Sequence, residues 1–201
     1  NAPGSFLQSY DLGAAVEWSA DSWTVYGTVM RVAENDGGNA FLFAGAQVGY
    51  NHMNDLGEAN YRFVLTFAND EFLRPDGVST APRLAGLFSI DQRIGDSLGS
   101  CARAGSQDDR AVVTLLNMYS VGAQTVGSLW GRDKDTAAVG YAFLDGGNDG
   151  ISSTHAVEAY VRFALDESVS FTADVQRTHD HTLDGRTEEG WVVGGRLVLE
   201  F

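Results

Sequence analysis

The side chains with the clearest chemistry recur at every second position of a segment. Glu158, Tyr160 and Arg162 stand two residues apart, with apolar residues between them. In an extended chain such residues lie on the same face, so these three would line one surface. Planar donors and acceptors of this kind suit solutes rich in hydroxyl groups, and a tyrosine ring offers a flat face to a ring-shaped solute.

The same alternation assigns further arginines, carboxylates and amides to one polar face. Opposed rows of arginine and carboxylate would create a transverse field across an enclosed space. The alternative is that these charges only neutralise each other inside a solvated interior. The predicted polar-face residues are Arg62, Asp91, Arg93, Arg103, Glu158, Tyr160, Arg162, Asp174, Gln176 and Arg196.

The last segment, residues 191–201, shows which element positions such side chains. Trp191, Val193, Leu197 and Leu199 share one face, while Arg196 lies opposite, and the segment continues to Phe201. This period-two pattern predicts a β-strand with lipid on one side and water on the other. A terminal aromatic residue is typical of bacterial outer-membrane barrels, whose assembly machinery reads the final strand, so Phe201 is the predicted insertion signal.

The pattern repeats along the chain and predicts about eleven or twelve strands in one all-β domain over residues 1–201. Only the seventh, from about 113 to 126, is ambiguous in phase, because Leu115 and Leu116 are adjacent. Aromatic residues gather near the predicted strand ends, as in the girdles of membrane barrels. Short predicted turns (20–22, 53–58, 95–97, 130–135 and 165–168) alternate with longer polar loops (33–40, 69–83, 105–110, 145–153 and 178–188).

Composition narrows the class of protein. The 24 glycines and 3 prolines among 201 residues suit long strands with tight turns. No apolar run approaches the roughly 18 residues of a membrane-spanning helix, although transmembrane strands leave no such signal. A net charge of −14 argues against nucleic acid as a partner. A soluble acidic β-sandwich shares this composition, but it has no reason to sort its loops by length.

Several segments in order resemble the carbohydrate-selective porin family (OprB type). Residues 59–63 resemble its G-N-Y-R strand, and residues 158–163 resemble its E-x-x-Y-R-F strand. Residues 91–105 resemble its D-Q…G-L-F-A-R-x-G hairpin, although Ser100 stands where an aromatic residue is common. Residues 127–135 resemble its G-x-x-x-G-R-x-x-D turn, and the motifs together extend from about residue 40 to the end.

The resemblance implies an antiparallel transmembrane β-barrel in the bacterial outer membrane, with lipid and lipopolysaccharide around it. It implies passive, selective diffusion of sugars, for which Arg103, Glu158 and Arg162 are the preferred residues because they lie in these motifs. Relatives form barrels of about sixteen strands, with both ends on the periplasmic side. An odd count near eleven therefore predicts that other strands, of this polypeptide or another chain, complete the barrel.

The sequence leaves two other function classes open. The chain could be a structural wall of a multi-chain outer-membrane assembly with little transport. An outer-membrane hydrolase is less favoured, since G-x-S-x-G is absent and no nucleophile, base and orienting group fall together. No cofactor is expected.

Metal binding was considered at two kinds of loop. His179 and His181 are predicted to lie in a loop, where they could bind a divalent metal adventitiously without the spacing of a known zinc site. Acidic loops could bind Ca²⁺ through hard oxygen ligands, with solvated loop charge as the simpler account. Those acidic positions are Glu34, Asp36, Asp149, Asp180 and Asp184.

Overall fold

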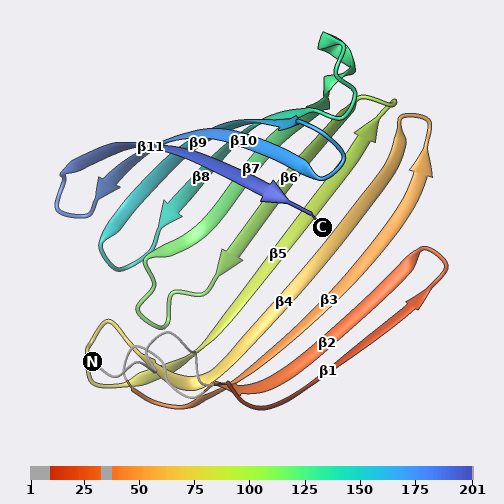
Figure 1. Cartoon of the computed structure of the whole chain (residues 1–201). Helices are drawn as coiled ribbons and strands as arrows, with labels where there is room; N and C mark the ends of the chain where they lie inside the picture. The colour runs from red at the N-terminus through yellow and green to blue at the C-terminus, as the bar shows by residue number, and fades with distance from the viewer. Residues whose placement is uncertain (1–9, 33–37, 201) are drawn as a thin grey trace.

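A single antiparallel sheet makes up the protein. The computed structural model describes residues 10–32 and 38–200, and its eleven strands pair in chain order, each with the next. The ribbon forms a strongly curved wall from β1 at one edge to β11 at the other (Figure 1). The strands are β1 Tyr10–Ala20, β2 Trp23–Val32, β3 Phe41–Asn54, β4 Gly57–Leu73, β5 Thr80–Ile94, β6 Leu98–Gln107, β7 Leu115–Val126, β8 Thr136–Gly146, β9 Ile151–Ala164, β10 Val169–Thr182 and β11 Thr187–Leu199.

The pairing register separates the two faces as the sequence predicts. Partners across a strand pair share a face, so each row can be followed across the sheet. One such row runs from Tyr141 through Val157 and Arg177 to Trp191. The sequence did not show which residues of β7 belong to which face. The pairing of Val121 with Tyr141 places Val121 on this same face. We call it the convex face, and the opposite face, which carries the predicted polar residues, the concave face.

The predicted loop lengths are only partly correct. Four of the turns at one end are short, and those after β1 and β3 occupy only residues 21–22 and 55–56. At the other end the connections 147–150 and 183–186 are also short, because the strands continue through segments predicted as loop. His179 and His181 therefore lie in β10 and His155 in β9, so the prediction that the His179–His181 segment is a loop is wrong. In residues 178–182 both faces of the strand carry polar side chains, so the apolar alternation that predicts a strand disappears.

The geometry of the turn between β7 and β8 explains the G-x-x-x-G-R-x-x-D motif of residues 127–135. A 3-10 helix spans Gly127–Trp130, and Gly131 follows with a left-handed φ of 76°. A Cβ on Gly127 would lie 2.0 Å from the Arg132 carbonyl oxygen, so only glycine fits there. Asp135 is 1% exposed and accepts hydrogen bonds from Arg132 Nε at 2.6 Å and the Ala164 amide at 2.9 Å. The motif thus fastens this turn to β9.

This buried carboxylate is held in its charged form. The hydrogen bond from Arg132 is the main cause that lowers the pKa of Asp135 to about 2. Burial acts in the opposite direction, but the amide of Ala164 and the indole of Trp130 add to the lowering.

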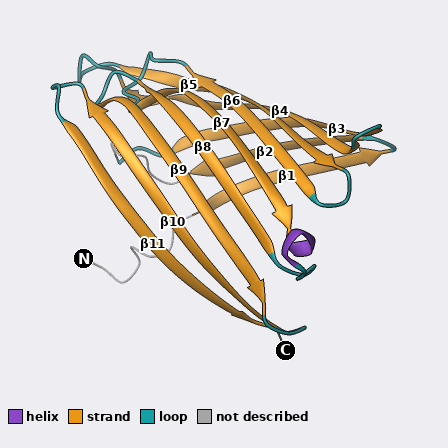
Figure 2. Ribbon diagram, turned by 90° about the horizontal axis from the view of Figure 1, so that it is seen from above, coloured by secondary structure: helices purple, strands orange, loops and turns teal. Residues whose placement is uncertain are grey.

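The sheet is not closed within the described residues. In the ribbon viewed from above, β1 and β11 lie at separate edges (Figure 2), and among residues 10–32 and 38–200 no strand pairs with the outer side of either. No helix among these residues is long and apolar enough to cross a membrane. The eleven antiparallel strands confirm the predicted all-β fold and the lower of the two predicted strand counts.

Candidate functional site

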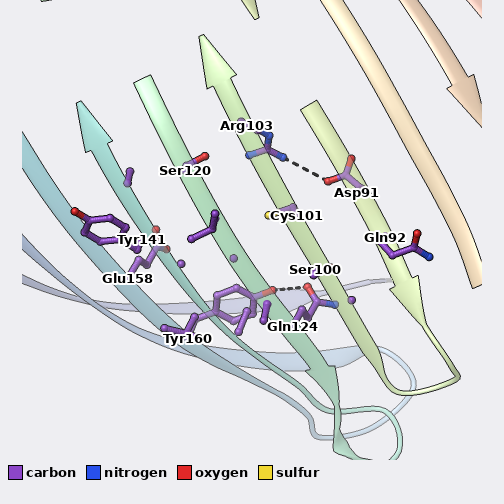
Figure 3. Close-up of a pocket in the computed structure, with 18 of the residues that line it drawn as sticks. Asp91, Gln92, Ser100, Cys101, Arg103, Ser120, Gln124, Tyr141, Glu158 and Tyr160 are labelled. Atoms are coloured by element: carbon purple, nitrogen blue, oxygen red, sulfur yellow. Dashed lines mark hydrogen bonds and ion pairs between the residues drawn. The ribbon is translucent and has the colours of Figure 1, made fainter. Parts of the chain in front are cut away.

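A hollow of about 700 Å³ lies on the concave face, over the strands from β5 to β9 (Figure 3). Its floor is made of small side chains, whose neighbouring positions follow one another across the paired strands. Small residues keep the sheet surface low, so longer side chains at the margins stand up around an open space. The floor residues are Gly99, Gly122, Ala138, Gly140, Ala142 and Ala156.

One wall of the hollow carries a cluster of two arginines and one carboxylate. Asp91 on β5 accepts a hydrogen bond from Arg62 Nη1 at 2.7 Å, and its other oxygen lies 4.0 Å from Arg103 Nη2. Register explains the meeting, because Ser89 pairs with Arg62 on one side and Arg103 on the other. Each side chain is partly exposed, so the pairs contribute little stability. The cluster carries one net positive charge, and two of its members, Asp91 and Arg103, line the hollow.

The opposite wall carries a tyrosine and an acid from β9. Tyr160 crosses above Ala138 and donates a hydrogen bond from its hydroxyl to Gln124 Oε1 at 2.9 Å. Glu158 lies one row away at the edge of the hollow and, among the described residues, makes no ion pair (Figure 3). Charged side chains of both signs therefore line the hollow, with hydrogen-bonding groups and an aromatic ring among them.

All ten predicted polar residues lie on the concave face, but only part of the set lines the hollow. Arg93 lines its margin near the turn, where it bonds the Gly95 carbonyl and lies 3.7 Å from Asp96. Four others belong to the concave face of β9–β11, and of these one, Gln176, reaches the hollow. Within the described residues none of these four forms an ion pair, so mutual neutralisation does not account for the three charged ones among them, although it applies to Arg62, Arg103 and Asp91. The four are Arg162, Asp174, Gln176 and Arg196.

Sequence reasoning missed the residues that shape the hollow. Gln124 and Ser120 line it, although the phase of their strand was ambiguous from the sequence. Cys101 also lies there on the concave face, with its sulfur 3.2 Å from where a Cβ on Gly122 would be. The small residues at alternate positions of successive strands could have indicated the floor of the hollow. They can be recognised as neighbours only when the pairing register of the strands is known.

The convex face is apolar across its middle and polar or aromatic at its ends. Along β10 the apolar positions run from Val169 to Val175, and Arg177 then begins the polar end. These seven residues span about 23 Å of strand, which a tilt of about 40° reduces to about 18 Å of height. Among the described residues the aliphatic rows between these ends carry no charge. An uncharged band of this kind, with polar and aromatic ends, is typical of the lipid-facing belt of a membrane barrel.

Aromatic rings gather at both ends of this band. At the short-turn end the rings of Trp23 and Tyr50 are 4.6 Å apart, and those of Tyr50 and Tyr61 are 6.4 Å apart. At the other end Tyr119 stacks on Phe143 at 6.4 Å. The predicted girdles therefore have counterparts on the convex face.

The remaining predicted sites have mixed outcomes. Phe201, Glu34 and Asp36 lie outside the described residues. Asp180 belongs to β10 and accepts a hydrogen bond from Thr154 at 2.6 Å, while Asp184 pairs with Arg186 at 2.8 Å. Among the described residues, no group of three or more histidine, cysteine, aspartate or glutamate side chains is arranged to hold a metal ion.

A curved meander of long antiparallel strands, apolar outside and polar inside, is the wall of a porin-type barrel. One solved structure that it resembles is the high-pH structure of Pseudomonas putida OprB, with a TM-score of 0.74 and 11% sequence identity. The match covers 94% of this chain and 58% of that one, so this chain spans little more than half of its length. No protein-family model and no curated protein sequence matches the chain. The likeness shows a porin-like fold and leaves the family resemblance a hypothesis.

Proposed function

We propose that the protein is the wall of an outer-membrane porin that passes sugars or similar small polar solutes by diffusion. The observation that carries the proposal is the division of one sheet into two faces. An uncharged aliphatic band with aromatic ends covers the convex face, while ten polar side chains lie on the concave face. That division suits a wall between lipid and water.

The open edges require further strands in a membrane. β1 has 11 residues and β11 has 13, and each edge would present unpaired N–H and C=O groups to lipid. Each such group costs several kcal/mol in hydrocarbon, so an open sheet of this length would not be stable there. We therefore propose that additional strands, from the same polypeptide or another chain, pair with β1 and β11.

The hollow supports a solute that carries many hydroxyl groups. Arg103, Asp91, Glu158 and Tyr160 supply donors and acceptors around a low floor, and their partial exposure favours weak, reversible contacts. A solute that must leave again is served better by several weak contacts than by one tight site. We propose a channel without enzymatic activity, on the likeness of the fold to a porin.

Liposome swelling tests the proposal. Vesicles that contain the closed assembly should swell in uncharged sugars, with rates that fall as the sugar becomes larger. The cavity variant Gly140→Trp should slow swelling, whereas the convex-face variant Ala159→Trp should not. Absence of swelling from a correctly folded, closed assembly would reject the channel and favour a structural wall.

A further inference from the structure

Two histidines project from the convex face of β10 beyond the apolar band. His179 and His181 stand two residues apart on one strand, so they share a face, and their ring centres are 4.7 Å apart. They follow Arg177, which marks the polar end of the band. Both rings line a hollow of about 340 Å³ on this face. Water can therefore reach the pair in a membrane-inserted protein.

The polar contacts of the two rings are made on the Nδ1 side, and no hydrogen bond to either Nε2 atom is seen among the described residues. His181 Nδ1 hydrogen-bonds Thr187 Oγ1 at 3.2 Å, and His179 Nδ1 lies 3.9 Å from Glu189 Oε2. His179 Nε2 is buried and has no hydrogen-bond partner among the described residues. Metal-binding histidines commonly bond a carboxylate or other polar group through one nitrogen and the metal through the other. His181 has this form through Thr187, and Glu189 lies near the Nδ1 atom of His179 at a distance too long for a hydrogen bond.

We propose that His179 and His181 chelate one divalent copper, nickel or zinc ion through their Nε2 atoms, with water in the remaining positions. Imidazole suits these metals, and Cu²⁺ should bind most tightly. Because His181 is exposed, its ring can turn to admit the ion between the two nitrogens. The charge of Arg177 beside the hollow is offset by Glu189, which it contacts at 2.9 Å.

A third histidine lies close by but is directed elsewhere. His155 pairs with His179 across β9 and β10, yet its ring packs 5.0 Å from Phe143 and its Nδ1 bonds the Tyr141 hydroxyl at 2.8 Å. It therefore serves as the matched control for the site, because it is also a histidine on the wall of the same hollow.

Copper titration of the folded protein in detergent, followed by electron paramagnetic resonance, tests the site. The native protein should bind one equivalent of Cu²⁺ with hyperfine structure from two nitrogens. His179→Gln and His181→Gln should each leave at most one nitrogen, while His155→Gln should keep two. Thr187→Val should weaken binding by on the order of tenfold, as loss of an outer-shell partner does.

Two results would overturn the proposal. One is a native spectrum without histidine nitrogens, and the other is equal loss of binding in His155→Gln. Circular dichroism on every variant shows whether the strand content is kept. Thr187→Val leaves both proposed ligands in place, so its weakened affinity is a readout that does not depend on removing either histidine.

Discussion

Asp91 is the side chain whose removal should most clearly alter ion passage. It faces Arg62 at 2.7 Å and Arg103 at 4.0 Å, so two positive charges and one negative charge leave a net charge of +1. In Asp91→Asn both arginines remain and the net charge becomes +2. If the concave face lines a water-filled path, the variant should favour anions over cations.

The size of this effect follows from the added unit charge. At about 5 Å in water, one unit charge stabilises a passing anion and destabilises a cation by about 0.8 kcal/mol each. At about 0.1 M salt, with a Debye length of about 10 Å, screening reduces the combined difference to about 1 kcal/mol, or about fivefold in the permeability ratio. At about 1 M salt the shift should fall below about twofold.

Reversal potentials across planar bilayers under a salt gradient measure this ratio. Asp96→Asn is the control, because it removes the same charge from a fully exposed position in the β5–β6 turn, 3.7 Å from Arg93. The reasoning is refuted if Asp91→Asn and Asp96→Asn shift the potential equally, or if the Asp91→Asn shift persists unchanged at high salt.

Three further predictions concern the fold that supports this surface. Asp135→Asn should lower the thermal midpoint of unfolding. In the native protein the stability that this carboxylate contributes should be lost as the pH falls from about 4 through about 2, because its pKa of about 2 in the folded state lies below its ordinary value. Thermal scans at several pH values measure both effects. Asn148→Ala removes three side-chain hydrogen bonds to residues 108–114, worth about 1 kcal/mol each, so limited proteolysis should cut that connection faster. Val139→Arg, on the lipid-facing band, should destabilise the inserted protein by about 2–4 kcal/mol in urea unfolding from vesicles, whereas Ala138→Arg on the concave face should cost much less.

The faces of the strands were predictable because successive side chains of a strand point to opposite faces, and here one face is apolar and the other polar. Glu158, Tyr160 and Arg162 were assigned to one surface from their spacing alone, and the register places them together. The same physics explains the errors. At His179 and His181 the strand continues beyond the apolar band, where both faces contact water, so hydrophobicity no longer distinguishes strand from loop.

Contacts between strands were beyond the reach of a single sequence. Tyr160 reaches Gln124 across 36 positions of sequence because Ala138 lies between them in the paired rows. That contact depends on the lengths of two turns and the exact pairing of three strands. The two glycines and Asp135 of residues 127–135 could be recognised as a motif in the sequence. Only the structure shows their role, which is to form a tight turn that is hydrogen-bonded to β9.

In the proposed channel the concave face lines a path for water and solutes. The native cysteine, Cys101, is on that face in the hollow, and it is the chain's single cysteine. A charged, membrane-impermeant thiol reagent added to the closed assembly in a bilayer should react with Cys101 and reduce single-channel conductance in a stepwise manner. The Cys101→Ala variant should conduct normally and ignore the reagent. Confirmed labelling of Cys101 with no change in conductance would contradict the account.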